Sequence, residues 1–100
     1  MSKNKEITIF IPTPLRTFTD NQKNVTVTGE NIDNALRSLI EQYPKLKNHL
    51  FDDKGSLRNF VNVYLNDEDI RYLNKEEVIL QEGDSLAIVP SIAGGKEGEK

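Results

Sequence analysis

The sequence contains no cysteine, no tryptophan and a single histidine, His49. The absence of cysteine excludes disulfides, thiolate zinc sites and a cysteine nucleophile, so any sulfur chemistry has to use a sulfur atom from outside the chain. One histidine cannot build a multi-histidine metal site, and a Ser-His-Asp triad would depend on His49 alone. His49 precedes Leu50 and Phe51, and we interpret it as structural. These absences exclude much of ordinary enzymology, and we do not expect the chain to be an enzyme in its own right.

Positive charge is not concentrated anywhere in the chain. The thirteen Lys and Arg residues are scattered and the formal net charge is -3, so no basic stripe is available to neutralise a phosphate backbone. No apolar run has the length of a membrane span, and the polar start of the chain, residues 1–6, lacks the apolar segment of a signal peptide. We therefore expect a cytoplasmic protein that binds neither nucleic acid nor a membrane. The length of 100 residues predicts one hydrophobic core.

The N-terminal part of the chain predicts a β-hairpin. From Glu6 to Ile11 apolar and other residues alternate, which is typical of a half-buried strand, and Pro12 follows. A polar loop then leads to a second short alternating run, in which Val25 and Val27 would face inward. The two runs are expected to pair antiparallel.

The middle of the chain predicts one main helix. After Gly29, Asn31 is placed to cap a helix that should end at about Tyr43, because Pro44 disfavours helical geometry at the residue before it. Its apolar residues recur at spacings of three and four and form one stripe. The segment 44–59 is long for a connection, but its apolar residues predict that it packs onto the domain and includes a single helical turn.

The last third predicts three strands. Phe60 to Leu65 is expected to be a central strand, followed by a turn over residues 66–69 and a short return strand through Ile70 and Tyr72. A turn at residues 82–84 precedes a last strand, Ser85 to Val89. The order predicts an α+β fold of the ubiquitin-like β-grasp type, in which a mixed sheet carries one main helix on one face.

The other sheet face would be open to solvent. Phe10, Phe60 and Tyr64 have the parity to lie on it, and they form a predicted docking surface for a partner. Isolated exposed apolar residues are also common without any function. Arg16, Arg58 and Arg71 could flank this surface and steer an acidic partner.

Acidic residues do not form a convincing site in the sequence. Asp67, Glu68 and Asp69 follow one another, but they lack the ligand spacing and central glycine of a calcium loop, so we interpret them as a solvated turn. Glu76 and Glu77 are adjacent, and nothing marks them as an acid and base pair. We predict no metal site and no bound cofactor.

Three segments resemble the MoaD/ThiS family of β-grasp sulfur carriers, and within it the CysO-like carriers linked to cysteine biosynthesis. They are residues 11–16 (IPTPLR), residues 60–71 (FVNVYLNDEDIR) and residues 82–95 (EGDSLAIVPSIAGG). The resemblance covers nearly the whole chain, and the last segment is its most specific part. It implies that an E1-like enzyme uses ATP to adenylate a C-terminal glycine carboxylate, after which a sulfur donor displaces AMP and leaves a thiocarboxylate.

By this resemblance Gly95 would carry the sulfur and Gly94 would let the tail enter a narrow active site. Glycine suits that task because it has no Cβ. Ser91, Ile92 and Ala93 would form a flexible arm. The chain would thus divide into a β-grasp domain, residues 1–92, and a tail, residues 93–100.

Gly95 is followed by Lys96-Glu97-Gly98-Glu99-Lys100, which departs from the family pattern. Its carboxyl group is therefore held in a peptide bond until a peptidase cuts between Gly95 and Lys96. The family implies a JAMM-type zinc protease for this cleavage and a cysteine synthase-like enzyme as the sulfur acceptor. A tail that does not belong to the native protein is the alternative for residues 96–100.

Two functions remain open from the sequence. The first is a sulfur carrier for cysteine biosynthesis, with thiamine, molybdopterin or tRNA thiolation as other destinations of the sulfur. The second is a ubiquitin-like modifier, in which the activated Gly95 is joined to lysine amines of other proteins. A β-grasp module that only binds partners would not need Gly94 and Gly95 at all.

Overall fold

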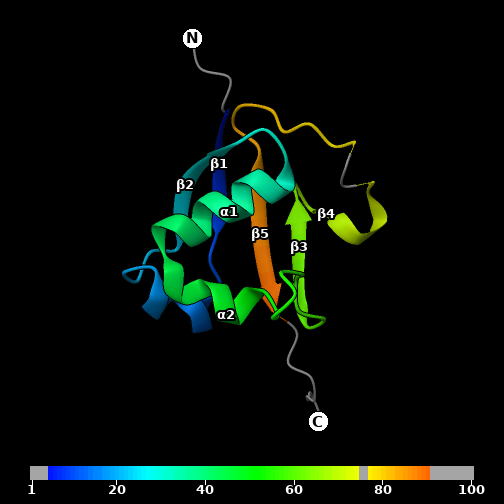
Figure 1. The fold of residues 1–100 in the computed structure, drawn as a ribbon. Coiled ribbons are helices and arrows are strands. Elements are labelled where there is room, and N and C mark those ends of the chain that lie inside the picture. The colour runs from blue at the N-terminus through cyan, green and yellow to red at the C-terminus, as the bar shows by residue number, and fades with distance from the viewer. Residues whose placement is uncertain (1–4, 75–76, 91–100) are drawn as a thin grey trace.

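The computed structural model describes residues 5–74 and 77–90, and they form a mixed sheet covered on one face by a helix (Figure 1). The predicted α+β layout of a β-grasp domain is thus confirmed. The strands are β1 (Lys5–Phe10), β2 (Asn24–Gly29), β3 (Val61–Leu65), β4 (Glu68–Asp69) and β5 (Ser85–Pro90). The helices are α1 (Ile32–Gln42) and α2 (Lys47–Leu50), and the 3-10 turns are η1 (Thr13–Phe18), η2 (Pro44–Leu46) and η3 (Ile70–Tyr72).

The last strand lies in the middle of the sheet, whose order is β2-β1-β5-β3-β4. β5 pairs in parallel with β1, through Ile9 opposite Leu86, and antiparallel with β3, through Val63 opposite Ile88. The strand predicted over residues 60–65 is β3, which is interior because it lies between β5 and β4, whereas the middle position of the sheet belongs to β5. The order of strands depends on long-range pairing, which alternation within one strand does not reveal.

The helix α1 begins and ends close to the predicted residues. The Asn31 side chain accepts a hydrogen bond of 2.8 Å from the backbone N–H of Asn34, which is the predicted cap, and Tyr43 follows the last helical residue. The apolar stripe of α1 is buried against the sheet and includes Ile32, Ala35, Leu36 and Leu39. It completes a core with Ile7 and Ile9 from β1, Val25 and Val27 from β2, and Leu86 and Ile88 from β5.

The β3–β4 hairpin differs from the prediction in two ways. β3 begins at Val61, whereas Phe60 lies in the preceding turn. The return strand consists of Glu68–Asp69 alone, and the residues expected in it, Ile70–Tyr72, form η3. Asn66 and Asp67 both have positive φ, 48° and 78°, which is the geometry of a tight two-residue hairpin turn, so the chain reverses earlier than expected.

The segment 44–59 packs onto the domain, as predicted. Leu46 and Leu50 are buried, and α2 supplies the expected helical turn. Beyond α2 the Asp52 carboxylate accepts hydrogen bonds from the backbone N–H groups of Lys54 and Ser56, at 2.9 and 3.1 Å. This tight loop stands between Phe51 and Leu57, which form an isolated antiparallel bridge. No helix within residues 5–74 and 77–90 has the length and apolar character needed to cross a membrane.

The outer edge of β2 is covered by side chains of α1. Lys23 accepts a hydrogen bond from Ile11 of the neighbouring strand, so by alternation the carbonyl groups of Thr26 and Thr28 point away from the sheet. The Ser38 hydroxyl donates to the Thr28 carbonyl at 2.8 Å, and the Gln42 amide donates to the Thr26 carbonyl at 3.3 Å. The helix therefore satisfies part of an edge that would otherwise be open to pairing.

We predict that Gly29→Ala destabilises the domain. A Cβ at Gly29 would lie 2.7 Å from the backbone nitrogen of Ala35 and 3.0 Å from its Cα, both on α1, so the helix would have to move off the sheet. Overpacking of this kind costs about 1–3 kcal/mol in the free energy of unfolding. Urea denaturation measures the loss. Thr28→Ala, at the exposed neighbouring position, is the control, and equal stabilities for the two variants would contradict the close approach.

Candidate functional site

The residues predicted to carry the chemistry lie outside the described part of the chain. They are Ser91, Ile92, Ala93, Gly94, Gly95 and Lys96. What the structure places is the point from which they continue, Pro90, the last residue of β5. Pro90 pairs with Val61 of β3, and β5 has a hydrogen-bonded neighbour on each side. The C-terminal segment thus follows directly from the central strand of the sheet.

Two of the three predicted docking residues lie in one row on the sheet face opposite α1, on either side of Ala87. Phe10 of β1 and Tyr64 of β3 are both paired with Ala87 of β5, so the three side chains form one row across the sheet. Phe10 is 44% exposed and Tyr64 is half-buried. Phe60 is 41% exposed but precedes β3, so the pairing of strands does not place it in this row.

Val89 extends this apolar surface and was missed by the sequence reasoning. It is 44% exposed and is paired with Asn62, which has the same parity as Tyr64. Its alternation with the buried Ile88 was visible in the sequence and could have identified it. Phe10, Tyr64, Ala87 and Val89 are hereafter called the open-face patch. The patch reaches the residue before Pro90, and so it adjoins the start of the tail.

The three arginines predicted to flank a docking surface do not share one environment. Arg16 donates from Nε to the carbonyl of Ile11 at 3.0 Å, next to the end of β1. Arg58 and Arg71 instead both line a cavity beside β3. Arg16 thus lies near the end of β1, whereas Arg58 and Arg71 lie near the two ends of β3.

The acidic run in the β3–β4 hairpin is partly neutralised by Arg71. The Arg71 guanidinium contacts both carboxylate oxygens of Asp69, with the shortest distance, 2.7 Å, between Nη2 and Oδ2. Hydrogen bonding to Arg71 lowers the pKa of the Asp69 carboxyl from its ordinary value, with the positive charge as a smaller cause. Within the described residues no three His, Asp or Glu side chains gather in the way a metal ion requires.

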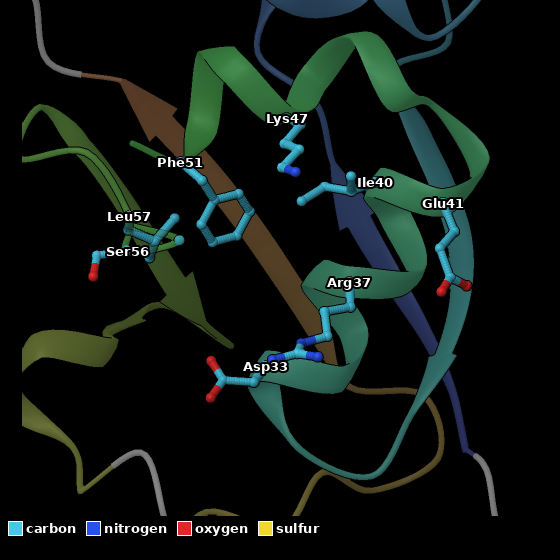
Figure 2. Close-up of a pocket in the computed structure, with 9 residues that line it drawn as sticks. Asp33, Arg37, Ile40, Glu41, Lys47, Phe51, Ser56 and Leu57 are labelled. Atoms are coloured by element: carbon cyan, nitrogen blue, oxygen red, sulfur yellow. The ribbon is translucent and has the colours of Figure 1, made fainter. Parts of the chain in front are cut away.

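A groove of about 540 Å³ lies between α1 and the Asp52 loop (Figure 2). Figure 2 shows Phe51 and Leu57 on one side and Ile40 on the other, with the Lys47 side chain directed into the space between them. Its charged lining is balanced, with Asp33 and Glu41 against Arg37 and Lys47. The groove therefore has an apolar floor but no preference for a ligand of one charge.

His49 contacts an aromatic ring rather than a catalytic partner. Its ring lies 4.4 Å from that of Phe18, centroid to centroid, and joins η1 to α2. This contact agrees with the structural interpretation. Glu77 is exposed, whereas Glu76 lies outside the described residues.

We predict that Arg71→Gln raises the pKa of Asp69 part of the way toward its ordinary value, because the guanidinium hydrogen bonds and the positive charge are lost while the backbone hydrogen bond from residue 71 remains. In the native protein the pair contributes stability at pH values above the ordinary carboxyl range, and this contribution is lost as the pH falls through the lowered pKa. NMR titration of the Asp69 side chain measures the pKa. Arg71→Lys should lower the pKa of Asp69 less than the native arginine does, since it keeps the positive charge but loses the bidentate hydrogen bonds, which are the larger cause of the lowered pKa. An unchanged titration midpoint of Asp69 in Arg71→Gln would contradict the assignment.

The chain is similar in sequence and structure to known proteins. Residues 9–95 match the family model described as the ThiS family. The chain is 37% identical over 91 residues to the sulfur carrier protein CysO of Mycobacterium tuberculosis, a match that covers 89% of this chain and 98% of CysO.

Solved structures agree with the sequence match. CysO in the Amycolatopsis orientalis BexX/CysO complex has a TM-score of 0.78 and 36% identity, with 89% of this chain and 99% of that chain covered. The small archaeal modifier protein 1 of Methanosarcina acetivorans has a TM-score of 0.80 and 28% identity, with 94% and 100% covered. These relatives share the β-grasp fold and are sulfur carriers or ubiquitin-like modifiers by name, and the chain belongs to the ThiS family.

Proposed function

We propose that this chain is a sulfur carrier, not a catalyst, that carries sulfur as a thiocarboxylate on Gly95 after residues 96–100 are removed. The observation that supports this most directly is where the family match ends. It runs through Gly95 and stops there, so the five residues that block the glycine carboxyl group lie outside the family pattern. The position of the predicted cut and the end of the family match therefore coincide.

The proposed activation needs two steps. The Gly95 carboxylate attacks the α-phosphorus of ATP, forming an acyl adenylate and releasing pyrophosphate. Hydrosulfide then attacks the acyl carbon, the bond to the AMP oxygen breaks, and a thiocarboxylate, AMP and one proton result. ATP binds to the activating enzyme rather than to this chain, which supplies only the carboxylate and the surface by which the enzyme holds it.

The tail is well placed to be handed to another protein. It continues from β5, which is hydrogen-bonded to β1 and β3, so a partner that grips the sheet also fixes the starting point of the tail. Glycine residues without Cβ atoms can then enter a narrow channel. A relative solved as a BexX/CysO complex supports the view that such carriers work through a protein partner.

We further propose cysteine biosynthesis as the destination of the sulfur, with activated serine as the acceptor. The support is the 37% identity to CysO over nearly the full length of both chains. In this scheme the thiocarboxylate sulfur attacks the Cβ of the activated serine and displaces its oxygen-bound leaving group. Hydrolysis of the resulting cysteinyl adduct then releases cysteine and regenerates the Gly95 carboxylate. A zinc protease would perform this hydrolysis and the initial removal of residues 96–100.

A protein modifier is the second candidate function, and the likeness to a small archaeal modifier protein favours it. The same adenylate would then be attacked by a lysine amine of another protein, which forms an isopeptide bond and releases AMP. The two functions share activation and differ in the acceptor. Lysine-linked adducts of Gly95 in native extracts would favour the modifier, whereas a free thiocarboxylate would favour the carrier.

We predict that the intact mass of the untagged protein from its native cells corresponds to a chain ending at Gly95 with one oxygen replaced by sulfur. This species should react with iodoacetamide, because the thiocarboxylate is a soft nucleophile. A variant truncated after Gly95 should form the species without any protease. Gly94→Val in the truncated variant is expected to prevent it, since a branched side chain would block the channel. Retention of residues 96–100 in cells with a high sulfur demand, without alkylation, would refute the carrier.

We also predict that Phe10→Ala in the truncated variant lowers kcat/KM for adenylation by the E1-like enzyme of the same cells. The loss should be about tenfold, the usual scale for a central aromatic contact, and should appear mainly in KM. Tyr72→Ala is the matched control, because Tyr72 is 84% exposed but belongs to η3 rather than to the open-face patch. Equal losses in both variants would rule out specific docking on the patch.

A further inference from the structure

A second cavity, of about 400 Å³, lies beside β3, between the residues that precede this strand and η3. Apolar side chains from three segments line it: Leu57 before the strand, Val61 and Val63 within it, and Ile70 and Leu73 in and after η3. Ile70 is buried, whereas Leu57 and Leu73 are only partly buried. The cavity thus has an apolar floor that is reached from solvent past two half-buried leucines.

The charged lining of this cavity has one sign. Arg58 and Arg71 line it, and no carboxylate of the described residues does. This differs from the balanced lining of the groove beside α1 and from the net charge of the whole chain, -3. A ligand with apolar and acidic groups would therefore meet complementary surface here.

Both guanidinium groups keep donors for such a ligand. Arg58 donates from Nε to the carbonyl of Asn48 at 2.8 Å, which fixes the side chain but leaves its two Nη groups without a partner among the described residues. Arg71 uses Nε and Nη2 on Asp69, and a guanidinium has five N–H donors. Each arginine is thus held in place by one residue, Arg58 by Asn48 and Arg71 by Asp69, while other N–H donors of its guanidinium can still bind a ligand.

The cavity is close to the start of the C-terminal segment. Val61 lines the cavity and is also the residue paired with Pro90, the last described residue of β5. The backbone N–H of Val61 donates to the carbonyl of Arg58 at 2.9 Å, so Arg58 is tied to the same point. A protein that contacts the chain at Pro90 would therefore lie beside the cavity.

We propose that the cavity formed by Arg58, Arg71 and the apolar residues between them binds an acidic, apolar peptide segment of the protein that receives the C-terminus. A carboxylate of the segment pairs with the free donors of the two arginines, and a neighbouring apolar side chain enters the cavity. The inference relies on the proposed function only for the identity of this partner. The binding itself is a property of the cavity and is tested without any sulfur chemistry.

The test is an NMR titration of the full chain, labelled with 15N, with two short synthetic peptides. In the probe, two aspartates alternate with two leucines; in its matched control, asparagines replace the aspartates. The amide shifts caused by the probe should be centred on Arg58, Val61 and Ile70, and the neutral peptide should bind about tenfold more weakly because the charge-assisted contacts are lost.

Two variants separate the arginines from general effects of charge. Arg71→Gln should weaken probe binding several-fold while the backbone hydrogen bond from Arg71 to Asp69 persists. Arg58→Gln should weaken it similarly, but it also removes the contact to Asn48. Arg37→Gln, which removes an equal charge from the groove beside α1, should leave probe binding unchanged.

Equal binding of the two peptides, shifts centred on Phe10 and Tyr64, or equal loss in Arg37→Gln and Arg71→Gln would overturn the inference, and so would the absence of any binding. Each of these results leaves the mass measurement on Gly95 unaffected. Conversely, a chain that never forms a thiocarboxylate but binds the acidic peptide at Arg58 and Arg71 would refute the proposed function and retain the cavity as a peptide site.

Discussion

The parallel pairing of β1 with β5 is the constraint on which the rest of this structure depends. Two parallel neighbours cannot be joined by a tight turn, so the chain between Phe10 and Ser85 makes a long excursion that includes β2, α1, β3 and β4. Helix α1 lies in that excursion, and its apolar stripe covers the core side of both strands (Figure 1). Strands β1, β5 and β3 occupy the interior of the sheet, and β2 and β4 lie at its edges.

The surfaces proposed for binding lie close to the C-terminal end of β5. The core lies on the α1 side of the sheet, whereas the open-face patch and the β3 cavity both adjoin the end of β5. Val89 belongs to the patch, and Val61, which is paired with Pro90, lines the cavity. Contacts on either surface would therefore act close to Pro90, and those in the cavity would also reach the core residues Val61, Val63 and Ile70.

Local patterns in the sequence predicted most elements, because they depend on neighbouring residues. The alternation of Ile7 and Ile9 predicted β1, and Asn31 predicted the start of α1. The reversal after Leu65 was placed too late. It depends on two consecutive residues with positive φ, Asn66 and Asp67, whereas the apolar Ile70 indicated that the return strand lay further along the chain.

Features that depend on tertiary pairing were not accessible in the same way. The central position of β5 depends on its partners, and the gathering of Arg58 and Arg71 around one cavity depends on how η3 packs beside β3. Phe10 and Tyr64 were assigned to one face correctly, because parity within each strand is local, but their common neighbour Ala87 required the register. The proposed role of Gly94 and Gly95 comes from resemblance to a family, and both residues lie outside the described part of the chain.

The hydrogen bonds from Ser38 and Gln42 to the carbonyl groups of β2 have a consequence for the protein as a solute. An exposed strand edge is a template onto which a second chain can pair, and continued pairing of this kind leads to aggregation. Here the helix occupies two of the acceptors that an incoming strand would need, those of Thr28 and Thr26. The helix that covers the core therefore also hinders the growth of the sheet beyond β2, although the opposite face exposes Phe10 and Val89.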